Sequence, residues 1–229
     1  NGAYTVNSAI NGSNHILKYD ADGNFVTGIP ISIRPFNGYS SYPGEGFKFK
    51  RNHNNGKFYF VGSLTNNTAM INGQIYDYED FSKYVCAFDS DGTFLWLKHN
   101  NSTNYTAFSL HDITVDNQNN IYYTGAGVVN GSAFGEYVPE SWNGQQFTSI
   151  YGSNQPFTLA FRVLVKMDEN GNNIWLTNAD TGVETGGGES VVKISGDEVI
   201  TGSGVNDFKW QNITNLNPLG NSSFSGRAS

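Results

Sequence analysis

Acidic turns recur three times along the chain and offer oxygen ligands for a metal ion. The pairs are Asp20 with Asp22, Asp89 with Asp91, and Asp168 with Asn170. Calcium takes several oxygen ligands from carboxylates and carbonyls. An EF-hand-type loop also has a third acidic ligand before its glycine and a glutamate at its last position, whereas here the glycine follows the second polar residue directly. The spacing favours tight hairpin turns and no cofactor, with calcium as the alternative.

Three glutamates supply the carboxylates that a polysaccharide-active enzyme would need. Glu136 and Glu140 lie in a long insert, and Glu45 lies in a Pro-Gly-Glu-Gly sequence. Glycosidases use a pair of carboxyl groups that flank the scissile bond, and nothing in the spacing of these three brings two of them together. We therefore expect solvated loop residues and assign no catalytic residue. A secreted glycosidase or lyase is the alternative function.

The histidines and the single cysteine form no reactive group in the sequence. There is no H-x-x-x-H or H-x-H pair and no G-x-S-x-G elbow, so metal and serine-triad chemistry lack their usual starting points. Cys86 lies in the apolar run 84–88. A reactive thiolate needs an accessible, electropositive setting, so we expect a buried, unreactive thiol. The scattered histidines are His15, His53, His99 and His111.

The segment 127–160 is a long insert in which aromatic residues stand among polar ones. Such a composition suits stacking on sugar rings or anchoring a protein partner. The alternative is that the aromatic side chains cover a sheet edge, which an all-β protein must protect. The insert contains Phe134, Tyr137, Trp142, Phe147, Tyr151 and Phe157. The predicted contacts to a ligand or partner are Tyr137, Trp142, Phe147 and Tyr151.

The composition excludes one class of partner and favours an extracellular location. The chain has 13 Lys and Arg against 20 Asp and Glu, a formal net charge of −7 and no basic run, so it would repel the phosphates of a nucleic acid. Charged residues make up 14% of the chain, below the roughly 25% of ordinary soluble domains. No apolar stretch reaches the roughly 18 residues of a membrane helix, so no transmembrane segment is predicted.

Two sequence elements alternate along the chain. The first is an apolar run, a D-x-[DN]-G turn and a second apolar run, at residues 15–26, 84–96 and 163–175. The turn glycine supplies the positive φ that a tight hairpin needs. The second element ends in aromatic or β-branched residues followed by [VT]-G and is preceded by its own polar turn. Its copies end at residues 58–62, 121–125 and 198–202.

Two hairpins in each repeat make four strands, which is the content of one propeller blade. No stretch has the 3.6-residue period of an amphipathic helix, and residues 76–81 allow a single helical turn at most. The predicted fold class is all-β and β-propeller-like, with about three four-stranded antiparallel blades in a partial or open ring. The single domain 1–229 divides into approximate repeats 1–45, 46–106, 107–186 and a partial 187–229.

In these residues the chain resembles the SBBP-type β-propeller repeats of secreted and surface proteins from Bacteroidetes-like bacteria. Such repeats carry D-x-x-x-N-x-Y-V-T-G, an insert with F-G, and F-V-A-K-x-D-x-x-G-x-x-x-W. Residues 111–178 follow that order most closely, through 116–125, the pair Phe134-Gly135, and 165–175. Residues 46–98 match more loosely.

The resemblance implies a non-catalytic binding or structural module of a secreted or cell-surface bacterial protein. Its implied partner is a glycan or a protein on the extracellular side. Proteins with such repeats are frequently exported by the type 9 secretion pathway, so a role as a substrate or component of that pathway is also implied. The outer-membrane secretion machinery is then a further partner.

The chain departs from the family pattern in two places. Thr27 stands where the other repeats have Trp96 and Trp175, and the insert 127–160 is longer than usual. Because propellers typically have 4 to 8 blades, about three blades are too few to close a ring. We therefore expect an arc of a larger propeller, an arc completed by another chain, or a further blade formed by the terminal segments.

Overall fold

The structure is a computed structural model of the 229-residue chain. It describes residues 14–35, 48–63, 69–77, 83–100, 107–129, 141–146, 159–180, 190–203, 209–210 and 224–228. Every regular element in these residues is a β-strand, which confirms the all-β prediction. The helical turn allowed at residues 76–81 is not found in the described part, because Tyr76 ends a strand; residues 78–82 lie outside the described residues.

The strands form six antiparallel sheets, which we name A to F. Sheet A contains β1 (Asn14–Tyr19) and β2 (Phe25–Ile31). Sheet B contains β3 (Ile33–Pro35), β6 (Ala69–Ile71) and β7 (Gln74–Tyr76). Sheet C contains β4 (Lys48–Arg51), β5 (Phe58–Ser63), β8 (Lys83–Phe88) and β9 (Phe94–His99).

The other three sheets come from the second half of the chain. Sheet D contains β12 (Ser141–Trp142) and β13 (Gln145–Gln146). Sheet E contains β10 (Ala107–Val115), β11 (Ile121–Val129), β14 (Leu159–Met167), β15 (Asn173–Asp180) and β18 (Lys209–Trp210). Sheet F contains β16 (Ser190–Ser195), β17 (Glu198–Ser203) and β19 (Phe224–Ala228).

Sheets C and E are built in the same way. In each, a first hairpin (β4–β5 or β10–β11) pairs through its second strand with a second hairpin (β8–β9 or β14–β15). These hairpins are the two alternating elements of the sequence, and both predictions are confirmed. Hairpins β1–β2 and β16–β17 confirm the remaining copies.

The first aspartate of the turn holds the hairpins closed. Asp168 Oδ1 accepts hydrogen bonds from the backbone N–H groups of Asn170 and Asn172 at 2.9 and 2.8 Å, and its Oδ2 accepts one from Asn172 Nδ2 at 2.9 Å. Asp20 and Asp116 make the same three bonds with the residues two and four positions later. These local bonds explain why a D-x-x-x-N sequence turns here.

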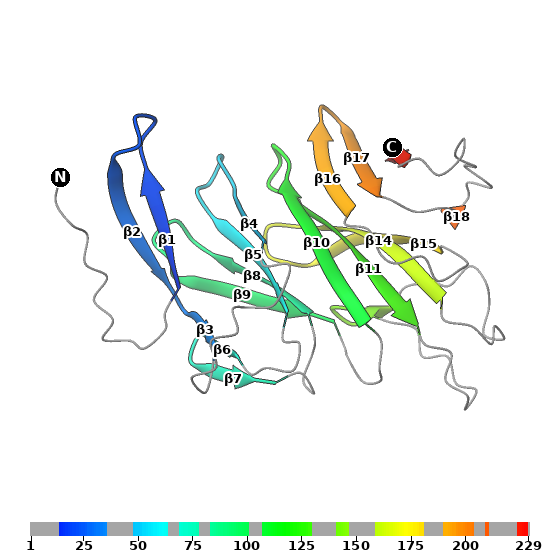
Figure 1. Cartoon of the computed structure of the whole chain (residues 1–229), viewed down its shortest axis with the longest axis horizontal. Coiled ribbons are helices and arrows are strands. Elements are labelled where there is room, and N and C mark those ends of the chain that lie inside the picture. Colours follow the sequence, from blue (N-terminus) through cyan, green and yellow to red (C-terminus); the bar gives the residue numbers. More distant parts are fainter. Residues whose placement is uncertain are drawn as a thin grey trace.

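Sheets A, C, E and F follow one another in chain order across the molecule, and sheet B lies below sheets A and C in the view of Figure 1. The first strands β4, β10 and β16 of three successive sheets lie beside one another, β10 in the middle. The tight turns of β1–β2, β4–β5, β10–β11 and β16–β17 point to the same side of the molecule, at the top of Figure 1. The described strands do not close into a ring.

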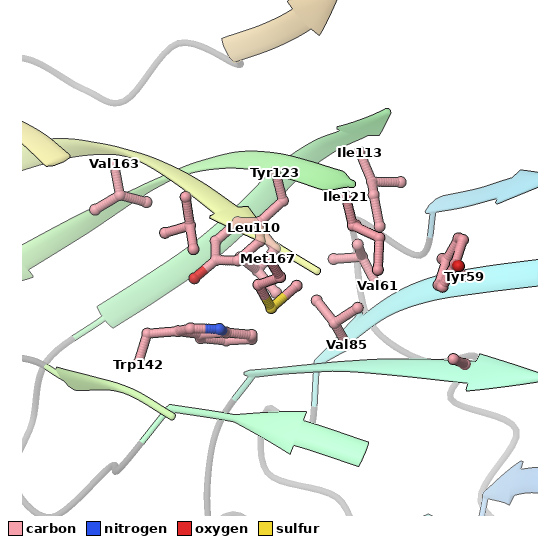
Figure 2. Packing of buried hydrophobic residues seen from close by; sticks show 12 residues of the cluster. Tyr59, Val61, Val85, Leu110, Ile113, Ile121, Tyr123, Trp142, Val163 and Met167 are labelled. Carbon is pink, nitrogen blue, oxygen red and sulfur yellow. The ribbon is translucent and has the colours of Figure 1, made fainter. Parts of the chain in front are cut away.

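Three apolar cores fill the spaces between successive sheets. The core between C and E contains Tyr59 and Val85 from one sheet and Tyr123 and Val163 from the other (Figure 2). Neighbouring residues on the same strands point the other way, since Phe60 and Cys86 belong to the core between C and sheets A and B. A smaller core joins sheet E to sheet F. Strands buried on both faces must be apolar throughout, which explains their unbroken apolar runs.

Candidate functional site

A cluster of buried and partly buried polar side chains lies between sheet E and strand β16 of sheet F, a boundary that we call the E–F seam. It contains His111, Asp112, Thr124, Arg162 and Ser190. An irregularity in the pairing of β10 places His111 there, because Leu110 pairs with Gly125 and Asp112 pairs with Thr124. Such a bulge re-aims side chains.

His111 and Ser190 are in direct contact. The backbone N–H of Ser190 donates to His111 Nδ1 at 3.0 Å, and Ser190 Oγ lies 2.9 Å from the same nitrogen. A backbone N–H can only donate, so Nδ1 is an acceptor and the neutral ring carries its proton on Nε2. Ser190 Oγ also lies 3.0 Å from Thr124 Oγ1, which donates to the backbone carbonyl of Val163 at 2.9 Å.

A serine beside an imidazole is the starting arrangement for nucleophilic catalysis. Here, however, the two side chains connect sheet E to strand β16. Ser190 is only 2% exposed, so a substrate carbonyl has no approach to its hydroxyl. Its own backbone N–H already donates to Nδ1. The network joins β10, β11 and β14 to β16 and holds the two sheets in register.

Asp112 completes the attachment of β16. Its Oδ2 accepts a hydrogen bond from the backbone N–H of Val192 at 3.0 Å and lies 3.9 Å from Lys193 Nζ. Its Oδ1 accepts from the backbone N–H of Ile113 at 2.9 Å. The carboxylate therefore already has a donor on each oxygen.

Arg162 is the exception in the seam. The side chain is 5% exposed, and within the part of the chain that the structure describes Nη1 has no hydrogen-bond partner. Burial lowers the pKa of the guanidinium from its ordinary value, and no carboxylate of the described residues offsets that effect. Buried charged groups are normally paired, so this arginine needs a further explanation.

Arg162 occupies an equivalent position in the repeats to Lys83 and Asn14, six residues before the turn aspartate. Burial lowers the pKa of Lys83 to about 8. Asn14 Nδ2 instead donates to the backbone carbonyl of Ile33 at 2.9 Å. Two of these three equivalent positions therefore hold a cation, buried at Arg162 and partly buried at Lys83.

A second contact between neighbouring repeats was missed in the sequence. In three places the chain pairs with the insert of the next repeat at or just after the last strand of a sheet: Ile33, which follows sheet A, pairs with Ile71, Asn100, which follows sheet C, pairs with Trp142, and Ala179 in the last long strand of sheet E pairs with Trp210. We call this contact the clasp. In the first two copies the next residue of the insert also donates its backbone N–H to the extension, Asn72 to Ser32 at 2.8 Å and Asn143 to His99 at 3.0 Å.

A short signal in the sequence marks the first two clasps. Ile71-Asn72-Gly73-Gln74 and Trp142-Asn143-Gly144-Gln145 share an N-G-Q sequence. Both residues of each Asn-Gly pair have positive φ, 50° and 81° in the first, 47° and 77° in the second. This is the geometry of a two-residue hairpin loop, for which Asn-Gly is the strongest short-range signal.

The structure places one of the four predicted contact residues. Trp142 is 0% exposed, and its ring centroid lies 4.6 Å from that of Tyr123. Figure 2 shows it beneath Leu110 and Met167. In this arrangement its indole belongs to the core and is not presented to a ligand. Tyr137, Phe147 and Tyr151 lie outside the described residues, as do Glu45, Glu136 and Glu140.

The acidic turns have the geometry of plain hairpins. Asp20, Asp116 and Asp168 use both carboxylate oxygens as acceptors for N–H groups of their own turn. The side chain of Asn24 is the main cause that lowers the pKa of Asp20. Within the described residues no group of three or more His, Cys, Asp or Glu side chains is placed to hold a metal ion.

Cys86 is fully buried and free, as the apolar run predicts. Burial raises the pKa of its thiol well above the ordinary value. This setting is the opposite of the one that activates a thiolate. In the ranges that the structure describes, no helix has the length and apolar character to span a membrane.

No protein-family model matches the chain, and no curated protein matches it.

Proposed function

We propose that the chain is an arc of an SBBP-type β-propeller and acts as a non-catalytic binding or structural module of a secreted or cell-surface bacterial protein. The observation that carries the proposal is the repeated contact between successive sheets. In this contact an outer strand of one sheet meets the D-x-[DN]-G turn of the next, and the insert of the next repeat pairs with the end of the previous sheet.

Propeller geometry is supported by the stacking of the sheets. The four strands of sheet C and the first four of the five strands of sheet E have the strand order of a blade, and the first strands of the two sheets lie beside each other. In a propeller the first strand of each blade lines the central channel. The two copies of the turn contact are Gly92 against Ile29 and Pro30, and Gly171 against Trp96 and Lys98.

A non-catalytic role is supported by the positions of the potentially reactive side chains within the described residues. Ser190 is buried and His111 partly buried between sheets E and F, and Cys86 lies in a core. Both are used in packing. The low fraction of charged residues, 14%, suits an extracellular surface that meets a glycan or a protein. Export by the type 9 pathway, with its outer-membrane machinery, is part of the same proposal.

A glycan panel with a turnover assay tests the function. The purified chain is incubated with bacterial and plant polysaccharides, and both retention and released reducing ends are measured. Retention without product supports the proposal, whereas product release would replace it with a polysaccharide-active enzyme. Fractionation of the source bacterium provides the second arm, because a cytoplasmic protein would contradict secretion.

A further inference from the structure

We propose that two copies of this chain complete one another's open blades, with hairpin β1–β2 of one copy pairing with strand β17 of the other. The inference rests on the proposed function, because it names the partner that completes the propeller arc. The observation that carries it is that sheets A and F hold the two halves of one four-stranded blade. In Figure 1 these sheets lie at opposite ends of the row, so one copy does not bring the two halves together.

Sheets C and E define the strands of a complete blade. Their second strands, β5 and β11, pair with the third strands β8 and β14, and the fourth strands β9 and β15 follow across the D-x-[DN]-G turn. Sheet A is a hairpin with that same turn, so β1 and β2 are a third and a fourth strand. Sheet F has a first and a second strand, β16 and β17. Among the described residues it has no fourth strand, and the short β19 stands in the third place.

The edge of β17 accepts an antiparallel strand in the register of a third strand. In each sheet the glycine of the [VT]-G sequence lies opposite the third strand. The pairs are Gly62 with Tyr84, Gly125 with Val163, and Gly202 with Ser225 of β19. The partners in β8 and β14 stand five residues before the turn aspartate, and His15 stands five residues before Asp20. In the proposed dimer His15 therefore pairs with Gly202, β1 takes the place of β19, and β2 adds the fourth strand.

An exposed apolar face on sheet A indicates a missing neighbour. Leu17 and Tyr19 of β1 are 47% and 54% exposed. The equivalent side chains of sheets C and E are 0% exposed and face the preceding sheet. They are Cys86 and Phe88 in sheet C, and Val165 and Met167 in sheet E. All three hairpins have the same register shift before the turn, so these positions correspond in structure as well as in sequence.

The aromatic packing of this face is already formed. Tyr19 and Phe25 pack edge to face, with ring centroids 5.8 Å apart and 80° between the ring planes. At the equivalent positions Phe88 and Phe94 have 5.7 Å and 76°, and that pair belongs to the core between sheet C and sheets A and B. Sheet A thus carries the surface that a preceding sheet of this repeat type covers.

Ordinary surface exposure does not account for the face. Val26 of β2 is also exposed, but so are its equivalents Leu95 and Ile174, so this position meets solvent in every described repeat. The positions of Leu17 and Tyr19 differ, because they are buried wherever a preceding sheet is described. A second copy supplies such a sheet, and burying the two side chains against it stabilises the assembly.

Two copies give a number of blades that can close a ring. Each copy supplies sheets C and E and one half-blade at each end, which amounts to three blades. Two copies therefore make six, within the 4 to 8 blades that propellers typically have, whereas three copies would exceed that range. The contact of sheet A with sheet F is heterologous, and such contacts form rings when the rotation between copies closes.

Sedimentation velocity over a concentration series tests the assembly. We expect a reversible monomer–dimer equilibrium, in which Leu17→Lys raises the Kd at least about tenfold, because it would bury an unpaired charge. Val26→Lys is the matched control and should leave the Kd unchanged. Both positions are exposed in the single chain, so circular dichroism should be the same for both variants. Unfolding of the dilute chain then reports on the single copy, in which the Gly23 turn faces open space.

A disulfide cross-link tests the register of the contact. A chain with His15→Cys is mixed with a chain with Gly202→Cys and oxidised. Residues directly opposite in an antiparallel pair have Cα atoms about 4.5–5.5 Å apart, within the range of a disulfide. The control pairs Lys18→Cys with Gly202→Cys, which would lie about 10 Å apart. We expect the first mixture to form a covalent dimer and the control mixture to remain uncoupled.

Several results would overturn the inference. They are a chain that stays monomeric throughout the series, a Kd that Leu17→Lys and Val26→Lys change equally, and equal cross-linking in the two mixtures. A monomer that retains glycans without product would overturn the inference and leave the proposed function standing. A dimer with the expected cross-link that releases product from a glycan would support the inference and refute the non-catalytic role.

Discussion

The indole Nε1 of Trp96 donates a hydrogen bond of 3.0 Å to the backbone carbonyl of Glu169, so the last strand of sheet C is tied to the turn of sheet E. Glu169 also accepts from Lys57 Nζ at 3.1 Å through its side chain. One turn residue thus meets both hairpins of the preceding sheet. The contact between successive sheets is a specific joint and not only an apolar surface.

Replacing Trp96 with phenylalanine should loosen this joint. The variant keeps an aromatic ring against Tyr59, whose centroid lies 6.0 Å away, but leaves the Glu169 carbonyl without its donor. We expect a loss of about 1–2 kcal/mol in the free energy of unfolding, the usual cost of removing one partner of a hydrogen bond. Urea denaturation followed by circular dichroism measures it. Trp175→Phe is the matched control, and an equal loss there would contradict the interpretation.

Alanine at Gly92 should be far more harmful than alanine at Gly23. Both glycines have positive φ, 91° and 82°, so both substitutions carry the strain of a left-handed residue, about 1 kcal/mol. A Cβ on Gly92 would also meet the backbone carbonyl of Pro30, whereas Gly23 faces open space. We expect Gly92→Ala to lower the free energy of unfolding by at least about 2 kcal/mol more than Gly23→Ala does. Urea denaturation of the two variants measures the difference. Equal losses in the free energy of unfolding for the two variants would contradict this prediction, because they would show that sheet A can move away from the Gly92 turn without destabilising the protein.

The hairpins could be predicted from the sequence because the forces that form them are local. The aspartate oxygens of each turn bond to N–H groups within four residues, so a short sequence is sufficient. The burial of Cys86 could be predicted for a similar reason, since a run that is apolar at every position must be covered on both faces.

The seam and the clasp could not be predicted in the same way. His111 and Ser190 are 79 residues apart, and their pairing depends on a bulge and on the stacking of two sheets. Trp142 was predicted to contact a ligand or partner because its neighbours in sequence are polar, with coverage of a sheet edge as the alternative. Its side chain is buried because the Asn143-Gly144 hairpin folds it back onto sheet C.

Cys86 should be unreactive in the native protein. Its thiol is fully buried and its pKa is raised by burial, so both access and the thiolate fraction are minimal. We expect no reaction with a disulfide reagent in buffer and one equivalent in urea, at the rate at which the protein unfolds. Rapid reaction in buffer would mean that the core between sheets A and C opens locally.

The buried amine of Lys83 should make stability rise between pH 8 and about 9.5. Its pKa is lowered to about 8 in the folded chain, whereas an unfolded lysine has a pKa near 10.4. Between these values the unfolded state binds more protons, so raising the pH favours the folded state. Lys83→Met should abolish this rise in stability and increase the free energy of unfolding at pH 7 by about 2 kcal/mol. Urea midpoints from pH 7 to 9.5 measure this, and identical profiles would refute it.

Trp142 offers the sharpest test of the clasp. Its carbonyl accepts from Asn173 Nδ2 at 3.1 Å, its backbone bridges to Asn100, and its ring fills the core beside Tyr123. Trp142→Ala should therefore cost about 3–5 kcal/mol, as for other large aromatic deletions in cores. The loss should appear as reduced cooperativity between sheets C and E, which hydrogen exchange resolves strand by strand.

The matched control for Trp142 is Ile71→Ala, the equivalent residue of the preceding clasp, buried in the core between sheet C and sheets A and B. It should weaken protection in sheets A and B while sparing β14 and β15, because the two clasps join different pairs of sheets. If both variants lowered protection equally throughout the chain, the repeats would unfold as one unit. If Trp142→Ala left stability unchanged and abolished glycan retention, its ring would serve the ligand and not the core.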